Sequence, residues 1–190
     1  MAELLKGIEL VKKDGSKVAA EKHLEGKLVA LYFSAEWCLP CRAFTPKLKE
    51  FYEKIVGELG LNFEVVFVSQ DKGEEELVGY FKEHHGDWVY IEFDSPEIEE
   101  LLEKFEIKAI PTLRIVKADG TVIVAEAHSE VNAEVGRLAM SKAIPTLRIV
   151  KADGTVIVAE AHSEVNAEEK GRIDPEVLFN TWKKSAEGGD

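Results

Sequence analysis

The stretch YFSAEWCLPCRAFTP, residues 32–46, contains both cysteines of the 190-residue chain, Cys38 and Cys41. The run that leads into it, KLVALYFSA (residues 27–35), is largely apolar, β-branched or aromatic, which predicts a strand buried on both faces of a sheet. Residues 41–59, which follow, carry apolar side chains at steps of three and four, which predicts a helix with one buried stripe. The two cysteines are therefore predicted at a strand-to-helix junction.

This position favours redox chemistry. The free N–H groups of a helix's first turn, together with the helix dipole, stabilise an anion and lower the pKa of a thiol placed there. We expect Cys38 to be the more exposed thiol and to attack a substrate disulfide, forming a mixed disulfide. Cys41, one helical turn further on and facing inward, would then attack Cys38 and release the reduced substrate. Pro40 stiffens the loop and is tolerated at a helix start.

Two other interpretations of the cysteine pair remain open. A C-x-x-C pair is half of a typical zinc site, and His84 and His85 would have to supply the other ligands. The cysteines would also be explained by packing alone. The strand–CxxC–helix context favours the redox interpretation, for which we expect neither a metal nor a cofactor. All five histidines are otherwise expected at the surface; they are His23, His84, His85, His128 and His162.

The overall composition limits the classes of partner. The chain carries 24 Lys and Arg against 36 Asp and Glu, a net charge of −12, so phosphate backbones repel it and we expect no nucleic-acid partner. No apolar run approaches the roughly 20 residues of a membrane span, and the first ten residues do not resemble a secretory signal. We therefore expect a protein of a reducing compartment, cytoplasmic or nuclear, with no membrane partner.

The remaining segments alternate between predicted strands and helices. A hairpin is expected around Asp14 and Gly15, and two helices are expected to begin at Pro96 and Pro175, after an N-cap residue. The other elements are a buried strand at 62–71, an acidic amphipathic helix at 72–85 and a short strand at 87–93. This order predicts an α/β fold.

One segment occurs twice, letter for letter. KAIPTLRIVKADGTVIVAEAHSEVNAE occupies residues 108–134 and again 142–168, with the linker VGRLAMS (135–141) between the copies. Each copy predicts a β-hairpin with an Asp-Gly turn. Solenoids contain three or more imperfect repeats, so two perfect copies do not indicate one. A perfect copy is either very recent or made on purpose.

Several of these motifs together resemble the nucleoredoxin and tryparedoxin branch of the thioredoxin fold; they are YFSAEWCLPCRAFTPKLKEFY, FEVVFVSQDKGEEELVGYF, GDW and IPTLRIVKADGTVI. The resemblance covers residues 1 to about 131 and the ending DPEVLFNTW. It implies a single thioredoxin-like domain over residues 1–190, with a central mixed sheet flanked by helices. It also implies dithiol–disulfide exchange with disulfide-containing proteins or small redox partners, and a cis proline opposite the cysteines.

On this basis we expect an apolar substrate patch around Cys38. Its members would be Trp37, Leu39, Pro40, and the pair Ile110 and Pro111 or, alternatively, the pair Ile144 and Pro145. Trp88 would belong either to the patch or to the core.

The chain departs from the family pattern at two positions. Leu39 stands where relatives commonly carry proline, which should shift the redox potential. Tyr32 stands where thioredoxins carry a buried aspartate, as in tryparedoxins. An obvious carboxylate base for Cys41 is therefore missing, and water or a nearby side chain must accept its proton.

The fold has one place for the hairpin that carries the cis proline, and either copy can fill it. The two copies would make identical contacts there, so only the connecting segments determine which copy is favoured. Each doubling of a loop's length costs only ~0.6 kcal/mol of folding free energy. We expect the first copy to fill the slot, which leads to a monomer or a segment-swapped dimer. The interpretation is a disulfide reductase whose duplication was engineered to create two competing states. An ordinary reductase with a recent duplication and a redox-inactive scaffold are the alternatives.

Overall fold

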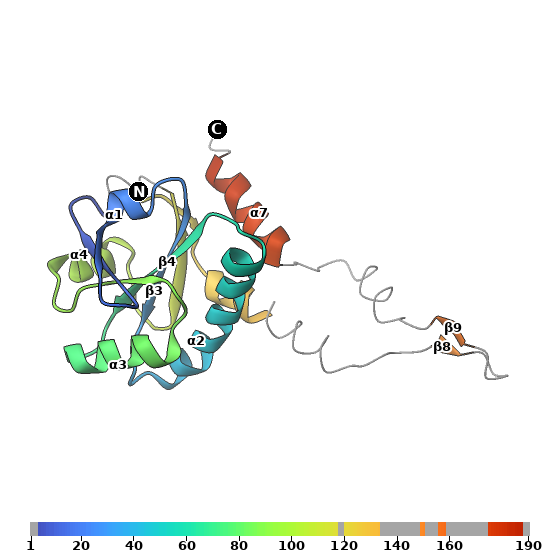
Figure 1. The fold of residues 1–190 in the computed structure, drawn as a ribbon, viewed down its shortest axis with the longest axis horizontal. Helices are drawn as coiled ribbons and strands as arrows, with labels where there is room; N and C mark the ends of the chain where they lie inside the picture. Colours follow the sequence, from blue (N-terminus) through green and yellow to red (C-terminus); the bar gives the residue numbers. More distant parts are fainter. Residues whose placement is uncertain (1–3, 118–119, 134–148, 151–155, 159–174, 188–190) are drawn as a thin grey trace.

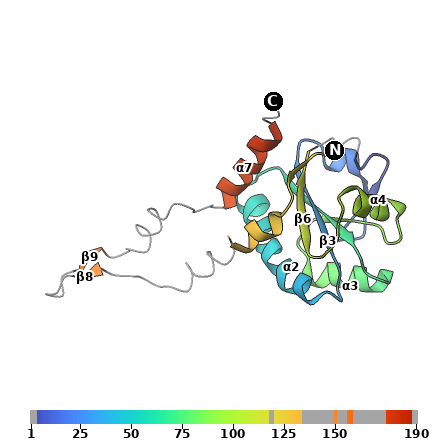
Figure 2. The same cartoon turned by 180° about the vertical axis from the view of Figure 1, so that it is seen from behind.

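The computed structural model describes residues 4–117, 120–133, 149–150, 156–158 and 175–187. These residues form a seven-stranded mixed sheet with the strand order β2-β1-β5-β4-β3-β6-β7, and a separate two-stranded sheet, β8-β9. Figures 1 and 2 show the large sheet with helices on both of its faces. The predicted α/β fold with a helix-flanked mixed sheet is confirmed.

Two parallel strands form the centre of the sheet. Every residue of β3 (Leu28–Ser34) and of β4 (Phe63–Ser69) is buried, as the apolar runs predict. The register pairs Leu28 with Phe63 at one end and Ser34 with Ser69 at the other. The segments that leave the two strands therefore emerge side by side at one edge of the sheet.

The outer strands on one side come from the N-terminal hairpin. Strands β1 (Glu9–Lys12) and β2 (Lys17–Ala19) pair antiparallel, and β1 also pairs antiparallel with β5 (Val89–Ile91). Gly15, at the predicted turn, has a φ of 84°, a conformation that glycine adopts without steric cost. The hairpin prediction around this residue is confirmed.

Helices cover the two faces of the sheet with separate apolar cores. Helices α2 (Leu39–Tyr52), α3 (Glu74–His84) and α7 (Pro175–Glu187) pack on one face, and α1 (Ala20–His23) and α4 (Pro96–Lys104) on the other. A π-helical stretch, η1 (Glu53–Glu58), continues α2. The views in Figures 1 and 2 place α2 and α7 on the side opposite α1 and α4.

The two copies of the repeated segment are built into different sheets. In the first copy, β6 (Thr112–Val116) pairs antiparallel with β3, and β7 (Val122–Val124) forms the edge of the large sheet. In the second, β8 (Ile149–Val150) pairs only with β9 (Val156–Val158) among the described residues. The rest of the second copy, and the linker 135–141, lie outside the described residues.

Helix α7 docks beside the first copy. Residues 127–133 of that copy are helical, and the indole Nε1 of Trp182 donates a hydrogen bond of 2.8 Å to Glu130 Oε2. Trp182 is 1% exposed, and its ring lies against the rings of Phe51 and Phe63. The closing helix and the first copy together complete the core on this face.

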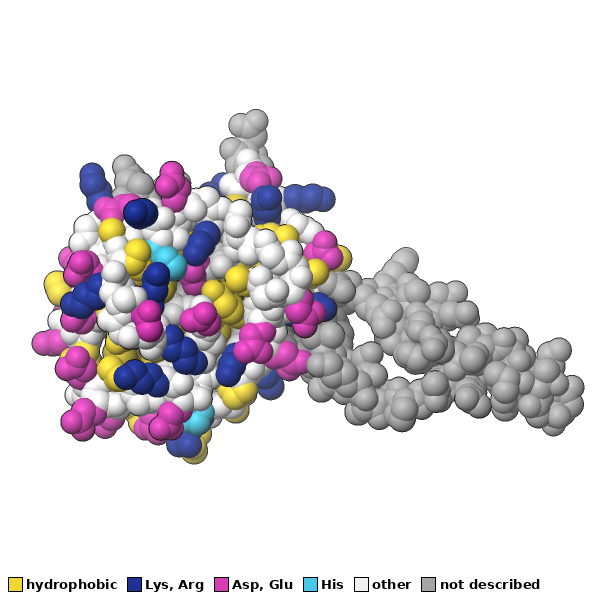
Figure 3. Space-filling model, viewed as in Figure 1, with side chains coloured by type: hydrophobic (Ala, Val, Ile, Leu, Met, Phe, Trp, Pro, Cys, Tyr) yellow, Lys and Arg dark blue, Asp and Glu magenta, His cyan; other side chains and the backbone are white. Residues whose placement is uncertain are grey.

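One face of the described part of the chain is shown in space-filling form. The face in Figure 3 carries acidic and basic side chains interspersed, with small hydrophobic spots between them. Within the described part of the chain, no helix is long and apolar enough to span a bilayer.

Candidate active site at the start of helix α2

The two cysteines form a disulfide where the chain leaves β3 and enters α2. Cys38 is the N-cap residue of α2, and Cys41 lies in its first turn. The main-chain N–H of Cys41 donates to Cys38 Sγ at 3.3 Å. A first-turn N–H of the helix therefore points at the sulfur that would carry the negative charge after reduction.

The disulfide is largely covered by protein. Cys41 is fully buried, and Cys38 is 6% exposed, so Cys38 is the more accessible thiol, though only slightly. Both pack with Ala35 and against Ile110. Cys38 Sγ lies 3.7 Å from the main-chain oxygen of Ile110, and the Ile110–Pro111 peptide bond is cis. The structure thus brings the first copy of the repeat to the disulfide.

Of the other expected patch residues, Trp37 and Leu39 are the most exposed large apolar side chains nearby, at 52% and 73%. Pro40 is also exposed, and Pro111 is half-buried. Trp88 is 1% exposed and belongs to the core. The alternative patch residues Ile144 and Pro145 lie outside the described residues.

The loop before Cys38 is held by the segment that follows β4. Asp71 Oδ1 accepts a hydrogen bond of 2.6 Å from the main-chain N–H of Glu36, and Trp37 Nε1 donates one of 3.0 Å to the main-chain oxygen of Gln70. Ser69 Oγ donates to Asp71 Oδ2 at 2.7 Å. Partial burial raises the pKa of Asp71. These contacts fix the loop that presents Trp37 and Cys38.

Sequence reasoning missed Asp71, although a signal existed. Asp71 follows a buried strand by two residues, and parallel strands end at the same edge of a sheet. The prediction of two buried strands therefore already implied that this carboxylate lies near the residues after β3.

A network of buried hydroxyl groups lies beneath Cys41. Thr45 Oγ1 is 2.8 Å from Tyr32 Oη and 2.5 Å from Tyr80 Oη, and it donates to the main-chain oxygen of Cys41 at 2.9 Å. The threonine has one hydroxyl proton, so both phenols must donate to its oxygen. Burial raises the pKa of Tyr32 far above its usual value. Tyr32, which stands where a thioredoxin carries aspartate, therefore stays neutral and helps to anchor Cys41.

The expectation that all histidines lie at the surface is wrong for His85. Its side chain is fully buried among the rings of Tyr32, Phe67, Tyr80, Phe81 and Trp88. Its Nδ1 accepts a hydrogen bond of 3.2 Å from Trp88 Nε1. Burial holds the pKa of His85 well below its usual value.

The zinc interpretation finds no support in this arrangement. His85 is engaged with Trp88 in the core, and His84 is exposed, with its Nε2 3.8 Å from Glu83 Oε2. The two cysteines are bonded to each other. Among the described residues, no group of three or more His, Cys, Asp or Glu side chains is arranged to hold a metal ion.

Comparisons with known proteins agree with the fold. A family model described as thioredoxin-like matches residues 26–122. Tryparedoxin of Trypanosoma brucei brucei is 44% identical over 110 residues, which cover 57% of this chain and 74% of the relative. Probable nucleoredoxin 1 of Arabidopsis thaliana is 39% identical over 121 residues, 64% of this chain. The chain spans about a fifth of the length of that nucleoredoxin, 20%.

Solved structures give the same result. A thioredoxin from Wuchereria bancrofti has 46% sequence identity and a TM-score of 0.65, with 73% of this chain and 94% of that chain covered. Tryparedoxin II in complex with glutathionylspermidine has 33% identity and a TM-score of 0.63, with 75% and 98% covered.

Proposed function

The chain belongs to the thioredoxin-like family, and we propose that it is a thiol–disulfide oxidoreductase that reduces the disulfides of proteins or small molecules. One observation carries the proposal: the Cys38–Cys41 disulfide lies at the start of α2, with the N–H of Cys41 directed at Cys38 Sγ. The same pair of atoms can be cycled between a disulfide and a dithiol without a cofactor.

The cycle begins with the reduced pair. The Cys38 thiolate attacks one sulfur of the substrate disulfide, and the other substrate sulfur leaves as a thiolate that takes up a proton. Cys41, as a thiolate, then attacks Cys38 Sγ; the mixed disulfide breaks and the second substrate thiol is released. The substrate gains two electrons, the protein is left with the Cys38–Cys41 disulfide, and an external dithiol must reduce it again.

The proposed substrate patch consists of Trp37, Leu39, Pro40, Ile110 and Pro111. Its exposed members surround a disulfide that is itself nearly covered, so a partner must be held close before its sulfur reaches Cys38. A disulfide-containing protein or a small redox partner fits this patch; the related tryparedoxin II has been solved with glutathionylspermidine. We place this activity in the cytoplasm or nucleus.

Insulin reduction tests the proposal. With dithiothreitol as the reductant, the protein should accelerate the precipitation of insulin chains, and Cys38→Ser should abolish the effect. Cys41→Ser should also stop turnover but should accumulate a mixed disulfide with insulin, visible on a non-reducing gel. Equal activity of the Cys38→Ser variant would remove the pair from the mechanism.

A second candidate function rests on the duplicated segment, which we propose competes for one structural slot. The supporting observation is that β8 and β9 pair Ile149 with Val158 and Val150 with Val156, the same register and the same irregularity as Ile115 with Val124 and Val116 with Val122 in β6 and β7. A second hairpin of the same geometry is thus available to replace the first, in the same molecule or in a segment-swapped dimer.

Paired substitutions test this replacement. Leu113→Asp should eject the first copy because Leu113 is fully buried, and the protein should nevertheless stay folded and active through the second copy. The double variant, Leu113→Asp with Leu147→Asp, should lose both the fold and the activity. Size-exclusion chromatography then distinguishes a monomer from a swapped dimer. If Leu113→Asp alone unfolds the protein as completely as the double variant, the second copy does not compete.

A further inference from the structure

Strand β7 forms one edge of the large sheet. Within the described part of the chain it pairs with β6 alone, so the main-chain groups on its outer side meet no other strand. None of its residues is buried: Val122 is 37% exposed, and Ile123 and Val124 are half-buried. The edge is therefore an uncharged, β-branched strand at the surface, which favours pairing with a further strand.

The opposite edge of the same sheet, β2, is protected by a charge. Lys17 begins this strand, and its Nζ lies 2.8 Å from Glu92 Oε2 and 4.0 Å from Glu9 Oε2. A lysine on an edge strand is a common protection against pairing with another chain. Strand β7 contains no charged residue, so it is the better suited of the two edges to accept a strand.

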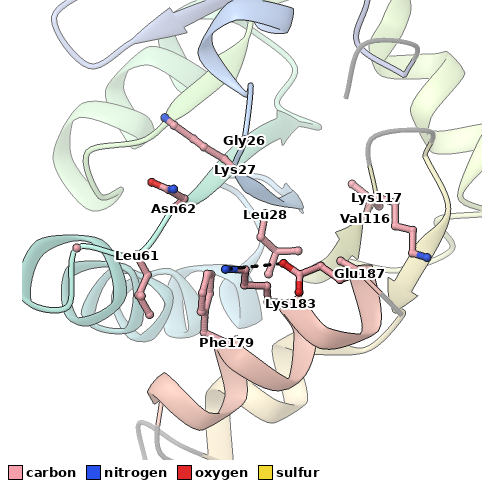
Figure 4. A pocket seen from close by; sticks show the side chains of 12 residues that line it. Gly26, Lys27, Leu28, Leu61, Asn62, Val116, Lys117, Phe179, Lys183 and Glu187 are labelled. Atoms are coloured by element: carbon pink, nitrogen blue, oxygen red, sulfur yellow. Dashed lines mark ion pairs between the residues drawn. The ribbon is translucent and has the colours of Figure 1, made fainter. Parts of the chain in front are cut away.

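A hollow of about 300 Å³ between the start of β3, the end of β6 and α7 is separate from this edge. Figure 4 shows Lys117 on one side of the hollow and residues of α7 on another, and among the described residues that line it none belongs to β7. Its charges are largely compensated, because Lys183 Nζ is 3.8 Å from Glu187 Oε1 and Lys27 Nζ is 2.8 Å from the buried Glu64. The outer side of β7 is thus a distinct surface of the first copy.

The second copy of the repeat contains a hairpin that lacks a third strand. Among the described residues β8 pairs only with β9, and the two form a sheet of their own. A two-stranded hairpin by itself is at best marginally stable in water, whereas a third strand adds main-chain hydrogen bonds and cross-strand side-chain contacts. One chain therefore carries both an edge that can accept a strand and a hairpin that is stabilised by adding to one.

Strands β7 and β9 have the same sequence, Val-Ile-Val. In an antiparallel register with Ile123 opposite Ile157, each valine of one strand is opposite a valine of the other, and such β-branched pairs are favourable. The first charged residue after β7, Glu126, is opposite Gly154 in this register. The pairing thus brings no like charges together.

We propose that the β8–β9 hairpin of one molecule adds to the β7 edge of a second molecule of this chain, with β9 antiparallel to β7. The first copy keeps its place beside β3, so this contact differs from the replacement of one copy by the other, and it does not involve the cysteines. The accepting and donating surfaces are different, so the contact is heterologous. Two molecules that each accept the other's hairpin form a closed dimer, in which both β7 edges are covered.

Sedimentation velocity of the full chain over a range of concentrations tests this association, and the unsubstituted protein should form dimers as its concentration rises. Val122→Lys places a charge on the accepting edge, and Val156→Lys places one at the equivalent position of the donating hairpin. Each change should raise the dissociation constant about tenfold or more. Val177→Lys, at a 51% exposed position of α7, is the control and should leave the dissociation constant unchanged.

The two variants should complement each other. Val122→Lys retains an intact hairpin, and Val156→Lys retains an intact edge. Their equimolar mixture should therefore associate at a concentration at which neither variant does so alone. Association of the mixture should be weaker than that of the unsubstituted protein, because only one of the two contacts can form.

Several results would overturn the proposal. They are a protein that stays monomeric, a mixture that does not associate, and a loss of association in Val177→Lys. Full dimerisation of Val156→Lys would mean that two β7 edges pair with each other, and full dimerisation of both variants would mean that the copies exchange; both contradict the proposal.

Circular dichroism shows whether each variant keeps its fold. Val156→Lys changes a residue outside the large sheet, so it tests the contact even if Val122→Lys is unstable. Insulin reduction by Val156→Lys should be unchanged, so failure of this proposal is distinguishable from failure of the redox proposal.

Discussion

The main-chain N–H of Cys41 points at Cys38 Sγ from 3.3 Å. After reduction, we expect this N–H and the positive end of the α2 dipole to stabilise a thiolate on Cys38, whereas Cys41 has its sulfur in the buried interior. Iodoacetamide at mildly acidic pH should therefore label Cys38 first, with peptide mass spectrometry as the measurement. Preferential labelling of Cys41 would reverse the proposed roles.

Trp37 should contribute to substrate binding and little to stability. Its side chain is 52% exposed and is held by one hydrogen bond to Gln70. Trp37→Ala should slow insulin reduction roughly tenfold, the equivalent of one lost contact of ~1.4 kcal/mol. The rate of reduction of a small aromatic disulfide serves as the control. It should change by less than about twofold, because such a substrate is too small to contact the whole patch. Unchanged insulin kinetics would exclude Trp37 from the patch.

Leu113 and Leu147 occupy equivalent positions in the two copies. Leu113 is fully buried in the core, and Leu147 lies outside the described residues. Leu147→Ala alone should leave the free energy of unfolding unchanged. Leu113→Ala should lower it by up to about 2–5 kcal/mol, the usual cost of a buried leucine truncation.

The double variant completes this experiment. If the second copy replaces the first, the loss in Leu113→Ala stops at the free-energy difference between the two arrangements, and Leu113→Ala with Leu147→Ala loses more. Urea denaturation measures the free energy of unfolding of the single and the double variant. A comparison of the two values then limits the free-energy difference between the arrangement with the first copy in the sheet and the arrangement with the second. A loss that appears only with Leu147→Ala would mean that the second copy fills the sheet.

Thr45 should matter more than its size suggests, because it accepts from two buried phenols and donates to the Cys41 carbonyl. Thr45→Val keeps the shape and leaves Tyr32 and Tyr80 without their shared acceptor. We expect a loss of about 2–5 kcal/mol in the free energy of unfolding, since each buried unsatisfied group costs about 1–3 kcal/mol. In a background with Tyr32→Phe and Tyr80→Phe the same change should cost distinctly less. Equal costs in both backgrounds would mean that the network contributes nothing beyond packing.

His85 should make stability fall in weak acid. Its pKa in the folded protein is lowered by burial, so at pH values below the ordinary histidine pKa of about 6.5 the unfolded chain binds a proton that the folded protein does not. Its contribution is complete above about pH 6.5 and is lost as the pH falls, by at most ~1.4 kcal/mol per pH unit for one proton. Urea denaturation between pH 7.5 and 5 measures the slope. His85→Met should reduce the slope of unfolding free energy against pH by up to ~1.4 kcal/mol per pH unit, the effect of one bound proton. An unchanged slope would assign the pH dependence to other groups.

The central strands and the redox junction could be predicted from the sequence because their signals are local. An unbroken apolar run is buried wherever it occurs, and β3 and β4 follow the runs around Leu31 and Val66. The cysteine junction needs only a strand, two residues between the cysteines, and a helix. The helix that begins at Pro96 was also predictable, although Ser95, its expected cap, hydrogen-bonds through its hydroxyl to Glu97 instead of the helix backbone.

The features of the site that the sequence did not reveal depend on contacts between residues that are distant in the sequence. His85 looks like a surface residue beside His84, and only the packing of α3 and Trp88 against β4 makes it part of the core. The contact between Asp71 and Glu36 joins residues 35 positions apart. The choice between Pro111 and Pro145 could not be read from their surroundings, because the two surroundings are identical in sequence; only the connecting segments differ.

The hydrogen bond between Trp182 and Glu130 joins residues that are 52 positions apart in the sequence. The docking of α7 on the first copy rests on contacts of this kind between described residues and sets no requirement on the sequence between them. Closing a longer or shorter loop changes the free energy of folding only slowly. The segment between Glu130 and Trp182 is thus an insertion site. An unrelated domain with adjacent termini should be tolerated there, and the thioredoxin-like domain should still fold.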